Sequence, residues 1–253
     1  MREGRLLQIL EILKKEQQVT VGDLAGRFHV AQMTIRRDLR ELGFRGVVER
    51  THGGAILSAR RNHGEPPMVQ RLDDQADAKR RIGQAVASTI QPGETVFIGS
   101  GTTASAVAQA LVGRDRLTVL TNALTVINAL ASSPEINVVV VGGFLRRDEL
   151  SFIGHIAETS MESLRVDKVI IGMRGIDPEH GLTSDHLQEL KTDQAILGSS
   201  NTVIIVADGT KFGRVATSRT APVTAASRIV TVREAPAEIL EAIRAQGVDV
   251  WQV

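Results

Sequence analysis

The sequence predicts an α/β protein in two parts: a small N-terminal domain of helices with one hairpin, and a larger domain built on a mostly parallel sheet. Three observations support this prediction. Apolar residues recur at helical spacing near the N-terminus, whereas β-rich apolar runs alternate with helical segments after residue 77. Between the two, Pro66-Pro67 interrupts a polar stretch and blocks a continuous helix. We therefore expect domains at residues 1–58 and 77–253, joined by a linker at 59–76.

The composition is that of a globular protein and excludes several classes. The 253-residue chain is 42% hydrophobic and 23% charged, which are ordinary values for a folded protein. It contains no cysteine, so disulfide frameworks and thiolate metal sites are excluded. No apolar run approaches the roughly 18 residues of a membrane span, and the charged N-terminus lacks the apolar core of a secretory signal. A cytoplasmic protein without membrane contact is expected.

The charge is distributed unevenly along the chain. Residues 1–64 hold 12 Lys and Arg against 7 Asp and Glu, although the whole chain carries a formal net charge of only +1. The rest of the chain is therefore mildly acidic. A basic segment on an acidic body indicates an anionic partner for the N-terminal part alone.

Helical periodicity marks three short helices at the start of the chain. The first covers residues 8–15, and Thr20 is a suitable N-cap for a second at 21–28. A three-residue link then leads into a third helix at 31–42. This order is typical of a helix-turn-helix, whose last helix enters the DNA major groove.

The third predicted helix carries apolar and polar residues on different sides. Ile35, Leu39 and Leu42 fall on one stripe, and guanidinium and amide groups project elsewhere. Arg can bind guanine or a phosphate, and Gln can bind adenine; a merely solvated helix is the alternative. The segments 47–51 and 55–57 predict a hairpin that adds a wing, which favours DNA contact. The candidate DNA-binding residues are Gln32, Met33, Thr34, Arg36 and Arg37 in the helix and Arg50, Thr51 and His52 in the wing.

Strand and helix signals alternate through the second domain. Strands are predicted at residues 95–98, 117–120, 136–141, 168–171, 202–206, 229–232 and 248–251. Helices are predicted at 77–90, where the cluster Lys79-Arg80-Arg81 is expected to be solvated, and between most strands, for example at 104–111, 124–131 and 187–197. Such alternation predicts a mostly parallel sheet covered by helices on both faces. Ligands of these sheets bind beyond the carboxyl ends of the strands, near a topological switch point.

The first strand-to-helix junction, Ser100-Gly101-Thr102-Thr103, is a candidate phosphate site. Glycine lets the backbone approach a ligand, and amides at a helix N-terminus favour an anion. An ordinary Gly-rich turn with a threonine cap is the alternative. After a later strand, Lys211 can pair with phosphate and Asp208 can accept hydrogen bonds from sugar hydroxyls. Glu189 and Lys191 are two positions apart, so they address different parts of a ligand or are plain surface charges.

The N-terminal motifs resemble those of a known family. TIRRDLREL at residues 34–42, followed by GVVERTHGGA at 46–55, is similar to the winged helix of the DeoR family of bacterial transcriptional regulators. That family usually places Ser at the cap of the recognition helix, where this chain has Ala31. Loss of such a cap typically costs ~1 kcal/mol of helix stability, and it removes a hydroxyl that could reach a phosphate.

The second domain resembles the effector domain of the same family along nearly its whole length. The similar stretches are GSGTT, LTVLTNAL, VVVVGGFL, GIDPEHGLT, ELK and ADGTKFG. The resemblance implies a fold similar to ribose-5-phosphate isomerase and binding of phosphorylated sugars. On this basis phosphate would be held by Ser100, Gly101, Thr102, Thr103 and Lys211, and the rest of the site would be lined by Asn122, Gly143, Lys191 and Asp208. Gly99 and Thr192 depart from the family, which commonly has Asp and Arg at these positions.

Three functions follow from these patterns. The leading interpretation is a repressor of a carbohydrate-metabolism operon, a homo-oligomer (dimer or tetramer) that binds double-stranded operator DNA and responds to a phosphorylated sugar. The runner-up is an aldose–ketose phosphate isomerase with Glu189 as its base. The third is a structural DNA-binding protein without a ligand. For the leading interpretation we expect no catalytic residue and no cofactor. We also expect no metal site, because His155, His180 and His186 lack metal-ligand spacing.

Overall fold

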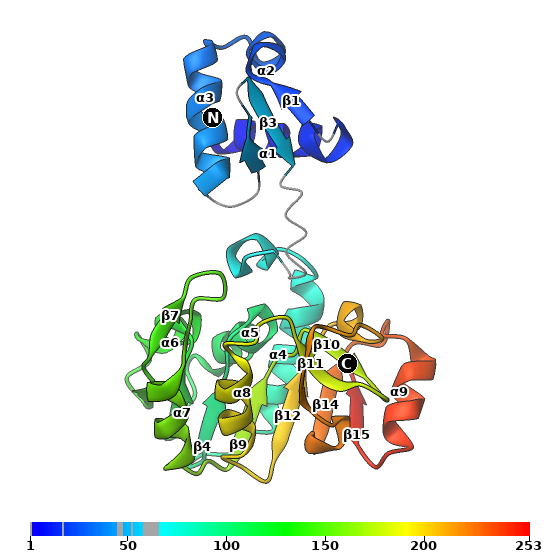
Figure 1. The fold of residues 1–253 in the computed structure, drawn as a ribbon. Helices are drawn as coiled ribbons and strands as arrows, with labels where there is room; N and C mark the ends of the chain where they lie inside the picture. The colour runs from blue at the N-terminus through cyan, green and yellow to red at the C-terminus, as the bar shows by residue number, and fades with distance from the viewer. Residues whose placement is uncertain (1, 17, 45–47, 52, 58–65) are drawn as a thin grey trace. The chain divides into compact units, whose positions relative to one another are not determined.

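The computed structural model describes residues 2–16, 18–44, 48–51, 53–57 and 66–253. The chain divides into two compact units, residues 1–62 and 63–253. Figure 1 shows the fold and labels many of the helices and strands. No helix among the described residues is both long and apolar enough to cross a membrane. The described side chains also form no group of three or more His, Cys, Asp or Glu that could hold a metal ion.

The N-terminal unit combines helices with a small antiparallel sheet. Its described elements are α1 (Arg2–Glu16), β1 (Gln18–Thr20), α2 (Val21–Phe28), α3 (Gln32–Phe44), β2 (Val48–Arg50) and β3 (Gly54–Leu57). The sheet order is β1-β3-β2, so the β2–β3 hairpin confirms the predicted wing, and β1 adds a strand that was not predicted. The side chain of Thr20 accepts a hydrogen bond from the Asp23 amide at 3.1 Å, which confirms the predicted N-cap of α2.

One stripe of α3 forms part of the core of this unit. Ile35, Leu39 and Leu42 are at most 1% exposed, as the helical spacing predicts. They pack against residues of α1, α2 and the sheet, among them Leu6, Ile9, Leu13, Val19, Leu24, Val48 and Ala55. Burial of this stripe anchors α3 on the unit and leaves its other side to solvent.

A seven-stranded parallel sheet forms the centre of the second unit. In spatial order it contains β15 (Asp249–Gln252), β14 (Arg228–Thr231), β12 (Val203–Val206), β9 (Lys168–Ile171), β4 (Thr95–Ile98), β5 (Leu117–Thr121) and β6 (Ile136–Val140). Each of the seven runs predicted from the sequence forms one of these strands. The central strands are buried on both faces, as in β12, where all four residues are buried. The predicted α/β class with a mostly parallel sheet is therefore confirmed.

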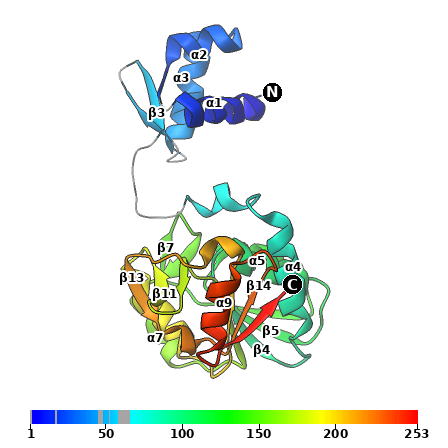
Figure 2. The same cartoon turned by 90° about the vertical axis from the view of Figure 1, so that its right-hand side faces the viewer.

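Helices cover both faces of this sheet. One face packs against α4 (Ala76–Ser88), α5 (Thr102–Leu111) and α6 (Leu124–Leu130), and the other against α7 (His155–Glu162), α8 (Leu190–Leu197) and α9 (Ala237–Arg244). Figure 2 shows α4 and α5 on the opposite side of the sheet from α7. Two separate apolar clusters result, with Ile204 and Val206 in one and Val203 and Ile205 in the other, because successive strand residues point to opposite faces.

The second unit also contains short elements that the sequence did not predict. They are the hairpin β7 (Phe144–Arg146) and β8 (Ser151–Ile153), the sheet β10 (Gly175–Asp177), β11 (Gly181–Ser184) and β13 (Ser218–Ala221), and the 3-10 turns η1 (Met68–Arg71), η2 (Gly209–Lys211) and η3 (Val223–Ala225). Each is only three or four residues long, too short to show a periodic pattern.

Part of the segment predicted as a linker packs on the second unit. Met68 is fully buried, and its amide donates a hydrogen bond to the carbonyl oxygen of Asp148 at 2.7 Å. The side chain of Lys79 on α4 is also buried rather than solvated, and its ammonium donates to the carbonyl oxygen of Arg71 at 2.7 Å. The expectation of a wholly solvated Lys79-Arg80-Arg81 cluster is therefore wrong for Lys79, because the turn η1 covers it, whereas Arg80 is exposed.

Candidate functional site

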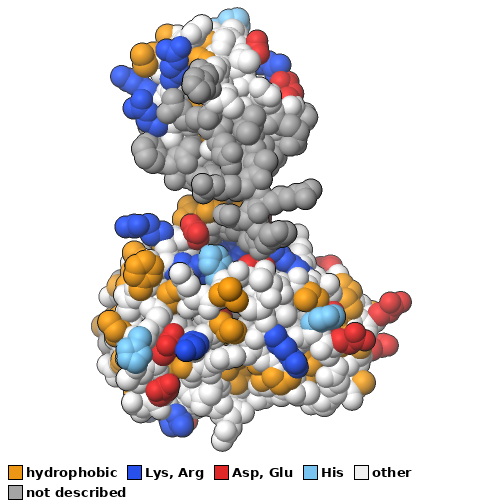
Figure 3. Space-filling view, viewed as in Figure 1, with side chains coloured by type: hydrophobic (Ala, Val, Ile, Leu, Met, Phe, Trp, Pro, Cys, Tyr) orange, Lys and Arg blue, Asp and Glu red, His pale blue; other side chains and the backbone are white. Residues whose placement is uncertain are grey.

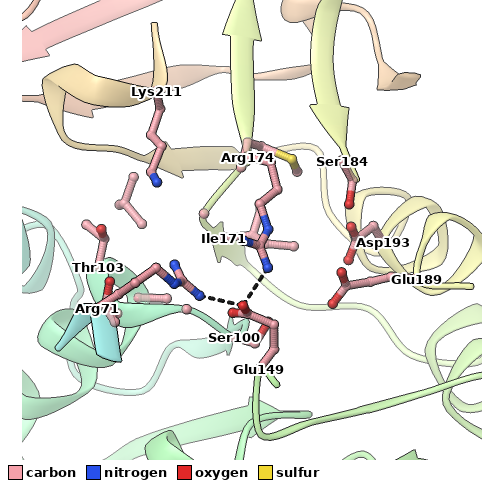
Figure 4. A pocket seen from close by; sticks show the side chains of 16 residues that line it. Arg71, Ser100, Thr103, Glu149, Ile171, Arg174, Ser184, Glu189, Asp193 and Lys211 are labelled. Carbon is pink, nitrogen blue, oxygen red and sulfur yellow. Dashed lines mark hydrogen bonds and ion pairs between the residues drawn. The ribbon is translucent and has the colours of Figure 1, made fainter. Parts of the chain in front are cut away.

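A cavity lies at the carboxyl ends of β4, β9 and β12, three neighbouring strands of the sheet. From this point β5 and β6 follow β4 on one side, and β12, β14 and β15 follow β9 on the other. The chain therefore reverses its strand order between the neighbouring strands β4 and β9. This is the topological switch point, at which α/β sheets bind ligands. The cavity contains about 590 Å³ of empty space, its open mouth included. Figure 4 shows the side chains that line it.

The first wall of the cavity is suited to an anion. It is formed by Ser100, by Gly101 with a φ of 103°, and by the first turn of α5, including Thr102 and Thr103. The first amides of a helix have no partner within the helix, and the helix dipole adds partial positive charge there. Lys211, at the end of η2, lines the same cavity. The structure therefore brings together the five residues predicted to bind phosphate.

The second wall is an ion-pair cluster that the sequence did not reveal. Glu149 is 4% exposed, and its Oε1 accepts hydrogen bonds from the guanidinium groups of both Arg71 and Arg174. The dashed lines in Figure 4 mark these two contacts. Arg71 comes from η1, Glu149 from the β7–β8 hairpin and Arg174 from the loop after β9. A cluster joined from three distant segments carries no local sequence signal.

The third wall is acidic. Ser184 comes from β11, Glu189 precedes α8, and Asp193 lies in the first turn of α8. Glu189 accepts a hydrogen bond from the guanidinium group of Arg146, and both side chains are buried. Burial, reinforced by the negative charge of Glu189, raises the pKa of Asp193 well above its ordinary value. Burial therefore favours the protonated form of Asp193, whereas Glu189 is ion-paired with Arg146.

Asp208 lies beside this cavity rather than in it. Its carboxylate accepts a hydrogen bond from the Thr210 amide at 2.9 Å and so begins the turn η2. It lines a neighbouring cavity together with Lys79, Thr102 and Lys211. Burial lowers the pKa of Lys79, and the charge of Asp208 opposes this shift. Asp208 therefore lies next to the predicted phosphate contacts and away from the acidic wall.

The three remaining predicted residues do not line the cavity. Lys191 is exposed on α8. Asn122 is buried, and its Nδ2 donates to the carbonyl oxygen of Phe152 at 2.9 Å. At Gly143 a Cβ atom would lie 2.6 Å from the carbonyl oxygen of Ile153, so glycine is required there for close backbone packing. These positions support the β7–β8 hairpin or face solvent.

In the N-terminal unit, the polar side of α3 is exposed and basic. Gln32, Arg36 and Arg37 are exposed, and the side chain of Met33 is 58% exposed, whereas Thr34 is half-buried. Figure 3 shows Lys and Arg side chains gathered where α3 lies. Asp38, an acidic residue that follows these arginines on α3, is buried and pairs with Arg5 of α1 at 2.6 Å. Its charge is thereby directed inward, away from the exposed arginines.

The wing is described in part. Arg50 ends β2, and Thr51 is exposed, with its amide donating to the carbonyl oxygen of Gly54 at 3.1 Å. His52, predicted to contact DNA, lies outside the described residues. The wing and the exposed side of α3 belong to the same unit, as a winged helix that reads DNA requires.

Comparison with protein families identifies both units. Residues 74–233 match the DeoR C-terminal sensor domain, and residues 5–61 match the DeoR-like helix-turn-helix domain. The chain belongs to the DeoR family. The resemblance found in the sequence motifs of both halves is thus confirmed.

Similar members of the DeoR family are named transcriptional repressors. The glycerol-3-phosphate regulon repressor of Escherichia coli K12 is 33% identical over 235 residues, which cover 93% of this chain and 92% of that protein. The putative aga operon transcriptional repressor of Escherichia coli O157:H7 is 30% identical, covering 96% and 91%. The transcriptional repressor AccR of Agrobacterium fabrum is 34% identical, covering 90% and 89%.

Solved structures of lower similarity were also found. The probable sor operon regulator from Shigella flexneri has 14% identity and a TM-score of 0.45, covering 68% of this chain and 89% of that one. Ribose 5-phosphate isomerase from Methanocaldococcus jannaschii has 14% identity and a TM-score of 0.41, covering 55% of each chain.

The structure shows the contacts at the three positions where the chain departs from the DeoR pattern. A Cβ atom at Gly99 would lie 2.9 Å from Cγ1 of Ile171, a buried side chain that lines the cavity. Ile171 therefore occupies the space that a carboxylate at position 99 would need. Thr192 is fully buried, and its hydroxyl accepts a hydrogen bond from the Gly154 amide at 3.0 Å. At α3, Ala31 offers no side-chain cap, and its carbonyl oxygen accepts from the Thr34 amide at 2.9 Å.

Proposed function

We propose that this protein is a repressor of a carbohydrate-metabolism operon whose affinity for operator DNA depends on a phosphorylated sugar. The observation that carries the proposal is the cavity at the switch point, where the first turn of α5 and Lys211 face the same space. A phosphate there would accept hydrogen bonds from helix amides and pair with an ammonium group. The names of the relatives support the same function, since they are repressors of a glycerol-3-phosphate regulon and of the aga operon.

The N-terminal unit supplies the DNA contacts in this proposal. Gln32, Met33, Thr34, Arg36 and Arg37 would enter the major groove, and Arg50, Thr51 and His52 would contact phosphate or the minor groove. The support is the exposed basic side of α3 on a buried apolar stripe. Operator DNA places this activity in the bacterial cytoplasm.

The effector contacts are proposed from the cavity wall. Ser100, Gly101, Thr102, Thr103 and Lys211 would hold phosphate, and Asp208 would position Lys211 from the neighbouring cavity. Asn122, Gly143 and Lys191 have no place in this proposal, because they do not line the cavity. Glu189, the candidate base of an isomerase, is ion-paired with Arg146. That ion pair engages Oε2 of Glu189 with an arginine that does not line the cavity, so the same cavity is suited to binding rather than to turnover.

Arg71 offers a route from the cavity to the rest of the chain. It lines the cavity and binds Glu149, and its Nε also donates to the carbonyl oxygen of Pro66 at 2.7 Å. Pro66 belongs to the segment that leads back to the DNA-binding unit. A ligand that changes the contacts of Arg71 therefore changes how the Pro66 carbonyl group is held. Only a ligand that binds two states of the protein with different affinity can shift operator affinity.

A second copy of the chain completes the operator-binding form. Operators read by a winged helix are usually paired half-sites, which require a symmetric oligomer. The edge strand β6 has sequence INVVV, and Val139 and Val140 are 44% and 48% exposed. Such an edge lacks the charges or proline that normally block strand pairing. We assign it to contact with the second copy, and Val139→Lys with Val140→Lys should reduce the mass measured by light scattering.

Electrophoretic mobility shift on the upstream intergenic region tests the proposal, with and without a panel of phosphorylated sugars. Wild-type protein should retain the fragment at moderate salt, and one sugar phosphate should change the retention. Lys211→Ala should keep DNA binding and lose this response, whereas the matched control Lys191→Ala should keep both. Absence of retention on any promoter fragment would contradict the DNA-binding function. Turnover of ribose 5-phosphate that Glu189→Gln abolishes would establish the isomerase instead.

A further inference from the structure

We propose that the cavity selects polyol and sugar monophosphates whose end remote from the phosphate is uncharged, and that Glu189 and Asp193 exclude ligands carrying a carboxylate or second phosphate there. The inference rests on the proposed function, since it takes the phosphate end of the cavity as given. It adds a rule for the ligand's other end.

The two ends of the cavity differ in chemistry. Figure 4 shows Lys211 and Thr103 on one side, and Ser184, Glu189 and Asp193 together on the other. The guanidinium of Arg174 lies between these groups and points to Glu149, to which it is bonded. A ligand with its phosphate at α5 and Lys211 therefore extends its remaining atoms toward hydroxyl and carboxyl groups.

The acidic end of the cavity is formed by Glu189 and Asp193 at the start of α8. Glu189 and Asp193 are four residues apart, and the Asp193 amide donates to the Glu189 carbonyl oxygen at 2.8 Å, so their side chains share one side of the helix. They are 7% and 9% exposed. Arg146 is bonded to Glu189 but does not line the cavity. A ligand entering the cavity thus meets the carboxylate of Glu189 before it meets the charge of Arg146.

Asp193 is available to a ligand. Among the described residues its carboxyl group has no hydrogen-bond or ion-pair partner, although it lines the cavity. Burial and the charge of Glu189 raise the pKa of its carboxyl group, which favours the protonated form, and a protonated carboxyl group can both donate and accept a hydrogen bond. A ligand hydroxyl can donate to Glu189 and accept from Asp193.

A ligand with an anionic group at this end of the cavity would be repelled. It would have to be buried beside the carboxylate of Glu189, where like charges at short distance disfavour binding strongly. It could not donate a hydrogen bond to Glu189. The same two side chains therefore bind a hydroxyl and reject a carboxylate.

Matched ligand pairs that differ only at the remote end test this selection. We would titrate the full-length protein by calorimetry with glycerol 3-phosphate against 3-phosphoglycerate, and with sorbitol 6-phosphate against 6-phosphogluconate. Four- and five-carbon alditol and aldonate phosphates complete the series, which therefore covers ligands of three to six carbons and includes the length that fits the cavity. For the length that binds best, the alcohol should bind at least about tenfold more tightly than the acid, the ratio produced by 1.4 kcal/mol.

Substitution at Glu189 should change the preference itself. Glu189→Gln removes the repelling charge and leaves Arg146 to attract an anion, so the ratio should fall or reverse toward the phosphoaldonate. The matched control Glu162→Gln, at an exposed position on α7, should leave the ratio unchanged. Asp193→Ala should weaken the alcohol severalfold more than the acid, whereas Lys211→Ala should weaken both alike.

The outcomes separate this inference from the proposed function. Wild-type protein that binds the phosphoaldonate as tightly as the matching alditol phosphate, or more tightly, would overturn the inference and leave the sugar-phosphate sensor intact. Failure of every phosphorylated probe to bind would overturn both. If thermal unfolding shows that Glu189→Gln does not fold, the ligand series measured on wild-type protein is sufficient to test the inference.

Discussion

The two regions that we propose to bind anions present their cations in opposite ways. On α3, Arg36 and Arg37 are exposed and extend from a helix that is anchored through its other side. In the cavity, Arg71 and Arg174 are buried and bound to the same carboxylate, Glu149. Exposed cations act nearly independently and can follow a long polyanion. Buried cations form one coupled unit, which suits a small ligand of fixed shape.

The largest expected effect breaks the coupled unit. Glu149→Ala leaves two guanidinium groups buried without their shared carboxylate, so it should lower the free energy of unfolding by about 3–5 kcal/mol. Chemical denaturation of the full-length protein measures this. The control Glu135→Ala, at an exposed position, should change it by less than about 0.5 kcal/mol. Equal small effects of the two substitutions would show that the cluster does not act as a unit.

Substitution on α3 should affect binding without affecting folding. Arg36→Ala should weaken specific operator binding by about 1–3 kcal/mol if the guanidinium contacts a base, with unchanged Tm. Fluorescence anisotropy on labelled operator DNA measures the affinity. Arg80→Ala, an exposed arginine of the second unit, is the matched control and should bind as wild type does. A loss of Tm in Arg36→Ala would show that this arginine is structural.

The buried acid of the cavity should make stability depend on pH. Because the pKa of Asp193 is raised from its ordinary 3.8, the unfolded chain releases this proton at lower pH than the folded chain does. The stabilisation is therefore complete below about pH 4 and declines as pH rises through the folded pKa. Asp193→Asn should flatten this part of the unfolding profile. Asp115→Asn, at an exposed position, should leave the profile unchanged.

The smallest effect concerns a local feature of the N-terminal unit. Thr20→Ala removes the side chain that accepts from the Asp23 amide, and it should destabilise α2 by ~1 kcal/mol. Hydrogen exchange of α2 amides in the full-length protein measures this change. Thr20→Ser retains an acceptor and should exchange nearly as wild type does. A cap substitution without effect would mean that packing alone fixes the start of α2.

The sequence predicted the features that depend on neighbouring residues. The stripe of Ile35, Leu39 and Leu42, the Thr20 cap and the seven strands of the large sheet are all local or periodic patterns, and the structure confirms them. The phosphate loop 100–103 is contiguous too, and the structure places it in the cavity wall. Its role as a ligand site stays a prediction.

The features that the sequence missed depend on long-range contacts. Glu149 meets Arg71 from 78 positions away and Arg174 from 25 positions away, so no window of the sequence contains the cluster. Arg71 also lay in a segment interpreted as a linker, because Pro66-Pro67 indicates an extended backbone and gives no sign that Met68 is buried. Asp193 was missed for a different reason. An acid at the start of a helix is usually exposed, and only the surrounding walls bury this one and raise its pKa.

The contact between Gly99 and Ile171 constrains how this protein can diverge. With the isoleucine in place, any side chain at position 99 collides with it, so an acid there requires a smaller residue at 171 first. Replacing Ile171 alone by a smaller residue leaves a void at the carboxyl ends of the strands. The two positions are therefore epistatic, and a shift of ligand preference by this path must pass through a less stable intermediate or take both steps together.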